Sequence, residues 1–176
     1  SLNQLIKVTN GANVTEYAYD AGGNLTSVKL NGEVQDTYGY TDAGWKDLLT
    51  SFNGQAITYD EIGNPLTYRD GYAFTWQYGR RLSSISHNGD SISYTYDPDG
   101  IRTSKTVNGT TTKYHVMNGT LLGQTKGSDT IVFLYDEKGN KYGFDYNGTK
   151  YYYIFNVQGD VIGILNQAGQ KIVSYT

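Results

Sequence analysis

The 176-residue chain has no cysteine, which excludes disulfide bridges, thiolate nucleophiles and zinc–thiolate sites. Proline is almost absent too, with two residues, so the composition is not that of a proline-rich disordered chain. Lys and Arg number 14 against 17 Asp and Glu, and the net charge of −3 argues against a nucleic-acid partner. No apolar run approaches the roughly 18 residues that cross a bilayer, so we expect no membrane insertion.

The start of the chain carries no targeting signal. Residues Ser1 to Gln4 do not form a signal peptide, and the first residue is not Met. We therefore expect a section of a longer protein.

Glycine and tyrosine are abundant where cysteine and proline are scarce. The 22 glycines lie well above the usual ~7% of residues, and 18 Tyr stand against 5 Phe. Aromatic rings supply large areas for packing even in a polar chain of mean hydropathy −0.54. This composition is typical of a β-protein with many tight turns.

A Tyr-Asp-x-x-Gly motif recurs along the whole chain. Its four clear copies are Tyr19, Asp20 and Gly23; Tyr59, Asp60 and Gly63; Tyr96, Asp97 and Gly100; Tyr135, Asp136 and Gly139. Degenerate copies start at Tyr40, Tyr78, Tyr114 and Tyr153, the last with Gly159 and Asp160. From Tyr19 to Tyr175 the tyrosines advance in eight steps with a mean period of 19.5 residues. In each copy Asp accepts nearby backbone N–H groups and Gly closes the turn at positive φ.

A second turn signal falls between these motifs. Its dipeptides tolerate positive φ at both centres of a type I′ hairpin: Asn31-Gly32, Asn53-Gly54, Asp70-Gly71, Asn88-Gly89, Asn108-Gly109 and Asn147-Gly148. Gly127-Ser128 and Ala168-Gly169 fill the two remaining gaps. Each period therefore contains two turns and two strands of five or six residues, near the usual strand length of ~5–6.

Between the turns, residues alternate as they do in strands. Ile92, Tyr94 and Tyr96 share one face, as do residues 131, 133 and 135 and residues 151, 153 and 155. No window shows helical periodicity. We predict an all-β fold of repetitive antiparallel β-hairpins in a curved or spiralling sheet. Residues 1–176 form one array of about eight repeats with no second domain, in which each tyrosine packs on the next period and its hydroxyl reaches water or a turn carbonyl.

The repeat resembles that of the Rhs/YD-repeat family. The pattern at residues 19–28, its copies and the run at residues 152–165 carry the resemblance, which extends over essentially the whole chain. It implies an antiparallel sheet that spirals into a hollow shell, which encloses a C-terminal toxin in bacterial members and serves adhesion in teneurins. It also implies that the chain ends where the family's core domain begins.

From this resemblance we expect a non-enzymatic scaffold of a secreted or cell-surface protein. Its partners would be the remaining repeats and the core or toxin domain of the same polypeptide. We also expect homo-association through open sheet edges, because the end strands near Val14–Tyr19 and Lys171–Tyr175 have few edge-blocking residues.

No catalytic or cofactor motif is found. His87 and His115 lie in different periods without a metal-binding or nucleophile motif around them, so we expect no metal and no cofactor. The segment at residues 97–100, Asp-Pro-Asp-Gly, lacks the third oxygen ligand of a calcium loop because residue 101 is Ile. It is similar to half of the family's self-cleavage signature, but the second half is missing, so we interpret it as a turn.

An alternative function is a carbohydrate-binding or adhesion module. Exposed aromatic rings present flat faces to sugars, and the candidates are Trp45, Trp76, Tyr78, Tyr151 and Tyr152. Asn-x-Thr sequons also occur at Asn13, Asn24, Asn108, Asn118 and Asn147. Turn chemistry explains most of these sequons without attached sugar.

Overall fold

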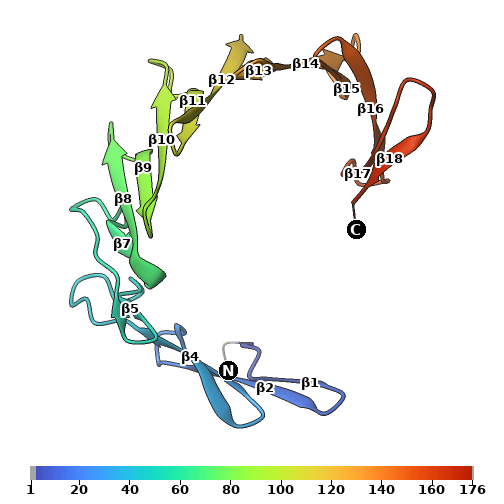
Figure 1. Ribbon diagram of the computed structural model, residues 1–176. Coiled ribbons are helices and arrows are strands. Elements are labelled where there is room, and N and C mark those ends of the chain that lie inside the picture. The colour runs from blue at the N-terminus through green and yellow to red at the C-terminus, as the bar shows by residue number, and fades with distance from the viewer. Residues whose placement is uncertain (1–2, 176) are drawn as a thin grey trace. The chain divides into compact units, whose positions relative to one another are not determined.

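The computed structural model describes residues 3–175, and nearly all of its regular structure is β-strand (Figure 1). The exception is a three-residue 3₁₀ turn, Arg69–Gly71, in which Asp70 has a positive φ of 62°. Contacts divide the chain into two compact units, residues 1–89 and residues 90–176. Within each unit, strands pair antiparallel with strands next to them in the chain, except that the sixth and seventh strands belong to different sheets, which confirms the prediction of an all-β fold of repeated hairpins. That the whole chain is a single array of about eight repeats stays a prediction.

Unit 1 contains nine strands within its described residues. They are β1 (Lys7–Asn10), β2 (Asn13–Tyr19), β3 (Leu25–Leu30), β4 (Glu33–Gly39), β5 (Ser51–Phe52), β6 (Gln55–Ala56), β7 (Thr67–Tyr68), β8 (Tyr72–Gln77) and β9 (Arg81–His87). Strands β1 to β6 form one sheet in chain order, and β8 pairs with both β7 and β9. The predicted edge strand at Val14–Tyr19 is wrong, because β1 pairs with β2 from Lys7 opposite Glu16 onwards. Strand β1 lies before Tyr19, the first tyrosine of the repeat on which the prediction relied.

Unit 2 also contains nine strands within its described residues, and from β11 onwards each pairs with the one before it. They are β10 (Asp90–Tyr96), β11 (Arg102–Val107), β12 (Thr110–Met117), β13 (Thr120–Lys126), β14 (Asp129–Tyr135), β15 (Lys141–Tyr146), β16 (Thr149–Phe155), β17 (Val161–Leu165) and β18 (Lys171–Ser174). Their lengths are far more even than those of unit 1, where β5, β6 and β7 have two residues each.

The Asn-Gly and Asp-Gly dipeptides lie at hairpin turns, as predicted. All six have positive φ at both residues; at Asn108-Gly109 the values are 47° and 80°. Both centres of a type I′ turn are left-handed, a conformation that Asn and Gly adopt at little cost. Gly127 has a positive φ of 59°, whereas the φ of Ser128 is not positive. A positive φ at the first central residue alone is the geometry of a type II′ turn.

Three turns differ in type from the predictions. Ala168-Gly169 belongs to a five-residue loop, residues 166–170, that is closed like the Tyr-Asp loops. The degenerate copies at Tyr78 and Tyr114 are instead tight turns with paired positive φ, 48° and 82° at Tyr78-Gly79 and 49° and 77° at Asn118-Gly119. These two copies lack an Asp or Asn after the tyrosine, so no side-chain oxygen can organise a longer loop.

A β-bulge follows most of the five-residue loops. In unit 2, Leu134 pairs with Gly143 but Tyr135 pairs with Lys141, so Tyr142 is the extra residue. A Cβ on Gly143 would collide with the carbonyl oxygen of Tyr151. Gly123 and Gly163 hold the same position beside their own bulges. Glycine there lets neighbouring strands approach closely.

The side chains pack mainly between neighbouring strands and not in a central core. Among the described residues the buried apolar side chains are Phe52 and Ile57, both in unit 1. In unit 2, register places Phe133, Phe144 and Tyr151 on one face, and the rings of Phe144 and Tyr151 stack with centroids 5.2 Å apart. This face therefore consists of half-exposed aromatic rings.

Candidate functional site

The Tyr-Asp-x-x-Gly motif forms a five-residue loop closed by one carboxylate. In the copy at residues 136–140, Asp136 Oδ1 accepts the N–H groups of Lys138 (2.9 Å) and Asn140 (2.8 Å). Asn140 Nδ2 donates to Asp136 Oδ2 at 2.9 Å, and Gly139 N donates to the Asp136 carbonyl at 3.0 Å. The first and fifth residues thus hold each other through backbone and side chain.

The same closure occurs with other residue pairs. Asp20 with Asn24 and Asp60 with Asn64 repeat it, while Asn156 with Asp160 reverses the acid and the amide. Asn166 with Gln170 uses two amides. The loop therefore needs an acceptor oxygen at its first residue, and it tolerates Asp or Asn there.

Hydrogen bonding lowers the pKa of the loop carboxylates. The side chain and then the backbone N–H of Asn24 hold the pKa of Asp20 below its ordinary value of 3.8, and Asn140 does the same for Asp136. At Asp60 burial is the largest influence and raises the pKa. The hydrogen bonds from Asn64 and Ile62 outweigh it, so that pKa also lies below its ordinary value.

Three of the motif tyrosines donate to carbonyl groups 10 to 14 residues earlier in the chain. Tyr19 Oη donates to Leu5 O (3.0 Å), Tyr59 Oη to Leu49 O (2.7 Å) and Tyr135 Oη to Leu121 O (2.7 Å). Burial raises the pKa of Tyr59. Each hydroxyl bond joins one loop to a preceding segment, which is a structural contact between periods.

A second set of contacts, which we name the tip latch, holds four hairpin tips. At Asn108 the backbone N–H donates to Ser91 O at 2.9 Å, and Ser91 N donates to Asn108 Oδ1 at 2.8 Å. Asn108 Nδ2 donates to Asp90 Oδ1 at 2.8 Å. Because Asn108 is left-handed, its own carbonyl turns away from the ladder, and its side-chain oxygen replaces that acceptor.

The latch repeats with the same atoms at other tips. Its members are Asn31 with Val14 and Asn13, Asn53 with Thr37 and Asp36, and Asn147 with Thr130 and Asp129. Sequence analysis missed the latch. The available signal is an Asp or Asn 17 or 18 residues before an Asn-Gly dipeptide.

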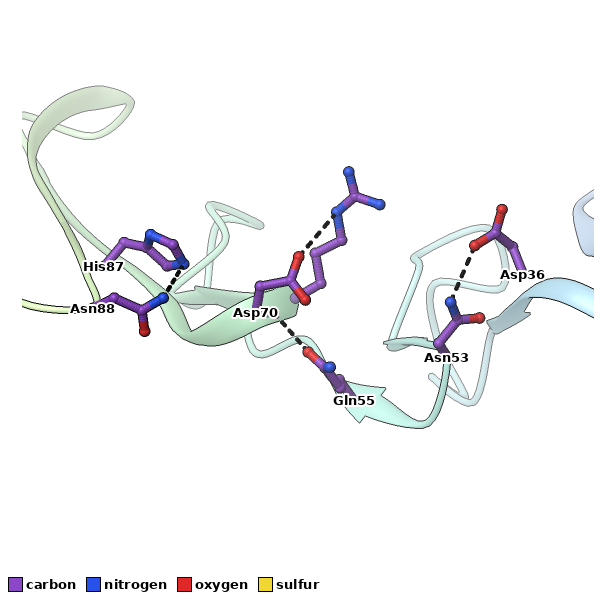
Figure 2. A network of polar contacts seen from close by, with 7 residues as sticks. Asp36, Asn53, Gln55, Asp70, His87 and Asn88 are labelled. Atoms are coloured by element: carbon purple, nitrogen blue, oxygen red, sulfur yellow. Dashed lines mark hydrogen bonds and ion pairs between the residues drawn. The ribbon is translucent and has the colours of Figure 1, made fainter.

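Figure 2 shows the latched tip of Asn53 together with two tips that lack the latch. Asn53 Nδ2 donates to Asp36 Oδ1 at 3.1 Å. Asp70 has the latch spacing from Asn88, but its carboxylate lies 3.8 Å from Arg69 Nε, and its backbone N–H donates to Gln55 Oε1 at 2.7 Å. Asn88 instead bonds the ring of His87 at 3.1 Å.

Three of the predicted binding aromatics lie in unit 1, and two of them, Trp45 and Trp76, contact the loop at residues 60–64 or the residue after it. Trp45 is 46% exposed, and its ring covers Gly63, where an added Cβ would lie 2.6 Å from Trp45 Cζ3. Trp76 Nε1 donates to the Pro65 carbonyl at 2.7 Å. Tyr78 is 81% exposed at its turn.

The other two predicted aromatics lie in unit 2 on opposite faces of β16. Tyr151 stacks on Phe144, and Tyr152 stacks on Tyr142 with ring centroids 6.3 Å apart. Consecutive strand residues point to opposite sides of a sheet. Tyr151 and Tyr152 therefore belong to different surfaces.

A pocket of about 520 Å³ opens beside Trp45 in unit 1. Its lining includes Asp42, Tyr59 and Glu61 in addition to Trp45. Asp42 Oδ1 accepts the N–H groups of Gly44 (2.9 Å) and Trp45 (2.7 Å), so this carboxylate fixes the loop that presents the ring. The pocket thus combines one aromatic face with carboxylates.

The two histidines have separate partners. His87 stacks on Tyr72 with ring centroids 3.8 Å apart, and His115 Nε2 lies 3.3 Å from Thr125 Oγ1. Among residues 3–175, no three His, Asp or Glu side chains gather in a way that could hold a metal ion. The same residues include no helix long and apolar enough to cross a membrane. At the Asp97 turn, Ile101 N donates to Asp97 Oδ1 at 2.8 Å, so this segment is another five-residue loop.

Comparison with known proteins shows that the chain is similar to a short part of much longer proteins. It is 32% identical to the tRNA3(Ser)-specific nuclease WapA of Bacillus spizizenii and 31% identical to the tRNA nuclease WapA of Bacillus subtilis strain 168. Both alignments cover 99% of this chain, which spans about 8% of each relative's length.

Solved structures support the fold alone. Crystal structures of TcdB2-TccC3-Cdc42 and TcdB2-TccC3-TEV match with TM-scores of 0.51 and 0.54 at 16% identity. Each match covers 93% of this chain and 10% of the solved chain. No protein-family model matches the sequence.

Proposed function

The chain belongs to the Rhs/YD-repeat family, and from this premise we propose that it is a non-enzymatic segment of a repeat shell. The shell encloses a C-terminal toxin of the same polypeptide, and the whole protein is secreted or displayed at the cell surface. Its partners are the neighbouring repeats and the domains that follow them. Because this chain spans about 8% of each relative's length, we assign the nuclease activity in their names to parts outside the matched region.

The observation that carries this proposal is that repeated hairpins pair side by side and that each period makes the same kinds of contact with the next. Within each unit most strands pair with strands next to them in the chain, and adjacent periods are joined by hydroxyl bonds of the motif tyrosines and by tip latches. Arrays of this kind extend by adding identical contacts. Exposed apolar side chains such as Val132 (47%), Phe155 (43%) and Ile172 (50%) suit a surface that other parts of a larger protein cover.

Two experiments test the proposal. The purified chain, incubated with tRNA, is expected to leave it intact, and cleavage that persists through further purification would contradict the non-enzymatic role. In a longer polypeptide that carries this array, we expect the region after the array to resist added protease.

The protection depends on the latches if the array forms the wall. Asn53→Asp, Asn108→Asp and Asn147→Asp together place a carboxylate opposite Asp36, Asp90 and Asp129, and protease should then reach the enclosed region. Asn118→Asp changes an exposed tip without a latch and is the matched control. Equal protection in the latch variant and the wild type would contradict the wall role.

Carbohydrate binding is the second candidate, and the pocket beside Trp45 favours it. The ring offers an exposed face, and Asp42 and Glu61 supply acceptors for sugar hydroxyls. Trp45→Ala is expected to abolish glycan-array binding in this case. Tyr78→Ala, at an exposed ring outside the pocket, is the control that should retain it.

A further inference from the structure

Seven asparagines in the chain precede glycine, the neighbour that least hinders attack on the asparagine side chain. They are Asn10, Asn31, Asn53, Asn88, Asn108, Asn118 and Asn147. All seven side chains belong to exposed residues, so exposure does not distinguish them. Their hydrogen bonds do.

Four of the seven are held by the tip latch. In each, Oδ1 accepts a backbone N–H of a neighbouring strand and Nδ2 donates to a side chain. At Asn147 the following amide is occupied too, since Gly148 N donates to Asp145 Oδ1 at 2.7 Å. Asn88 is held by the His87 ring.

Asn118 lies in a different environment. Its turn joins β12 and β13, and within residues 3–175 its side chain has no hydrogen-bond partner, as is also true of Asn10. The residue 18 positions before Asn118 is Gly100, which offers no side chain for a latch. Its amide is therefore free to rotate toward the backbone nitrogen of Gly119.

We propose that Asn118, followed by Asn10, is the site at which this array undergoes spontaneous deamidation, and that the tip latch protects the other Asn-Gly turns. The deprotonated nitrogen of Gly119 attacks Cγ of Asn118 and forms a C–N bond. The Cγ–Nδ2 bond breaks, and the nitrogen leaves as ammonia after taking up a proton. Water then adds to either carbonyl of the cyclic imide and reopens it to Asp or isoaspartate. Asparagine is among the thermolabile residues for this reason.

The latch slows this reaction because its hydrogen bonds must break before Cγ can meet the backbone nitrogen. Two side-chain hydrogen bonds of ordinary strength correspond to a retardation of roughly tenfold or more. Deamidation at Asn118 adds one negative charge to an exposed turn, and the isoaspartate product inserts an extra methylene into the backbone. The effect is independent of the proposed shell function.

Incubation of the full chain at mildly alkaline pH, followed by tryptic peptide mass spectrometry, tests the proposal. Cleavage after Lys105, Lys113 and Lys126 places Asn108 and Asn118 in separate peptides. We expect Asn118 to convert at least about tenfold faster than Asn108 in the folded chain. In urea the two rates should become similar, because the latch no longer exists. Equal rates in the folded chain would overturn the proposal.

A variant isolates the latch as the cause. Asp90→Ala removes the acceptor of Asn108 Nδ2, and we expect the rate at Asn108 to rise several-fold while the rate at Asn147 stays unchanged. An unchanged Asn108 rate would show that the latch does not protect it. A rise at both sites would mean that the variant has unfolded, and the wild-type comparison of Asn118 with Asn108 then decides.

Discussion

The five-residue loops of the two units have the same internal geometry but different external bonds. In unit 1, Asn24 Nδ2 also donates to Lys46 O (3.2 Å), and Asn64 Nδ2 also donates to Gly79 O (2.7 Å). Arg80 returns a bond to Ile62 O at 2.7 Å. In unit 2, Asn140 donates to Asp136 and, among the described residues, to no neighbouring loop.

This difference shows that one motif can serve as a closed turn or as a joint between turns. A loop can act as a joint only when its fifth residue has a side-chain amide. The NH₂ group of that amide has two N–H donors, one for its own loop and one for a neighbouring turn. Unit 1 adds the ring of Trp45 over Gly63 and the buried residues Phe52, Ile57 and Asn64. The irregular, short strands of unit 1 coincide with this extra packing, whereas unit 2 relies on regular strand pairing.

The largest expected effect comes from removing the side-chain amide of Asn64, which forms a joint in unit 1. Asn64 is 3% exposed, and Asn64→Ala leaves the carbonyl of Gly79 and an oxygen of Asp60 without their donors. We expect a loss of about 3 kcal/mol in the free energy of unfolding of unit 1, because buried polar groups lose their partners. Asn140→Ala, in an exposed loop, should cost about 1 kcal/mol in unit 2.

The two measurements need separate probes. Both tryptophans, Trp45 and Trp76, lie in unit 1, so their fluorescence in a urea titration follows that unit. Amide hydrogen exchange follows unit 2. Equal losses at Asn64 and Asn140 would remove the distinction between joint and closed turn.

The sequence alone predicts the repeat, the strands and the Asn-Gly turns, because these depend on local preferences and on a period of two. It predicts neither the joint at Asn64 nor the tip latch of Asn108, because both join residues in different periods whose register is set by bulges and loop lengths. Loop type at Ala168-Gly169 was also missed, since Asn166 two residues earlier provides the organising oxygen.

For the candidate site, the sequence identifies candidate aromatic residues but does not predict which of their rings lie close together. Trp45 precedes Gly63 by 18 residues and Trp76 follows Pro65 by 11, yet the structure shows that both rings contact the same loop region, at Gly63 and Pro65. Tyr151 and Tyr152 were grouped by proximity in the chain, yet strand geometry puts them on opposite faces.

A smaller effect is expected from matched glycine substitutions in the loops. Gly63 and Gly139 have nearly the same positive φ, 83° and 81°, so alanine is strained by about 1 kcal/mol at both. A Cβ added at Gly63 would collide with the ring of Trp45, whereas a Cβ added at Gly139 would have no atom within 4 Å. We expect Gly63→Ala to cost about 1–2 kcal/mol more than Gly139→Ala, because the ring must move.

The tryptophan itself supplies the control for this pair. In a Trp45→Ala background the added Cβ has no ring to displace, and the extra cost of Gly63→Ala should disappear. Urea titration of the four chains forms a double-mutant cycle. A cycle without coupling would show that Trp45 does not pack on the loop in solution.

The smallest expected effect concerns acid. The pKa values of Asp20, Asp60 and Asp136 lie below 3.8 in the folded chain. Each carboxylate therefore stabilises the fold at pH values above its pKa in the unfolded chain, and this stability is lost as the pH falls through its pKa in the folded chain. Unit 1 contains two of these groups, whereas the loops at residues 156–160 and 166–170 of unit 2 start with Asn, which does not titrate. Amide exchange should therefore rise more in unit 1 than in unit 2 as pH falls below 3.8. Carboxyl chemical shifts measured against pH check the cause directly: midpoints at or above 3.8 for the three aspartates would show that their loops do not hold the charged form.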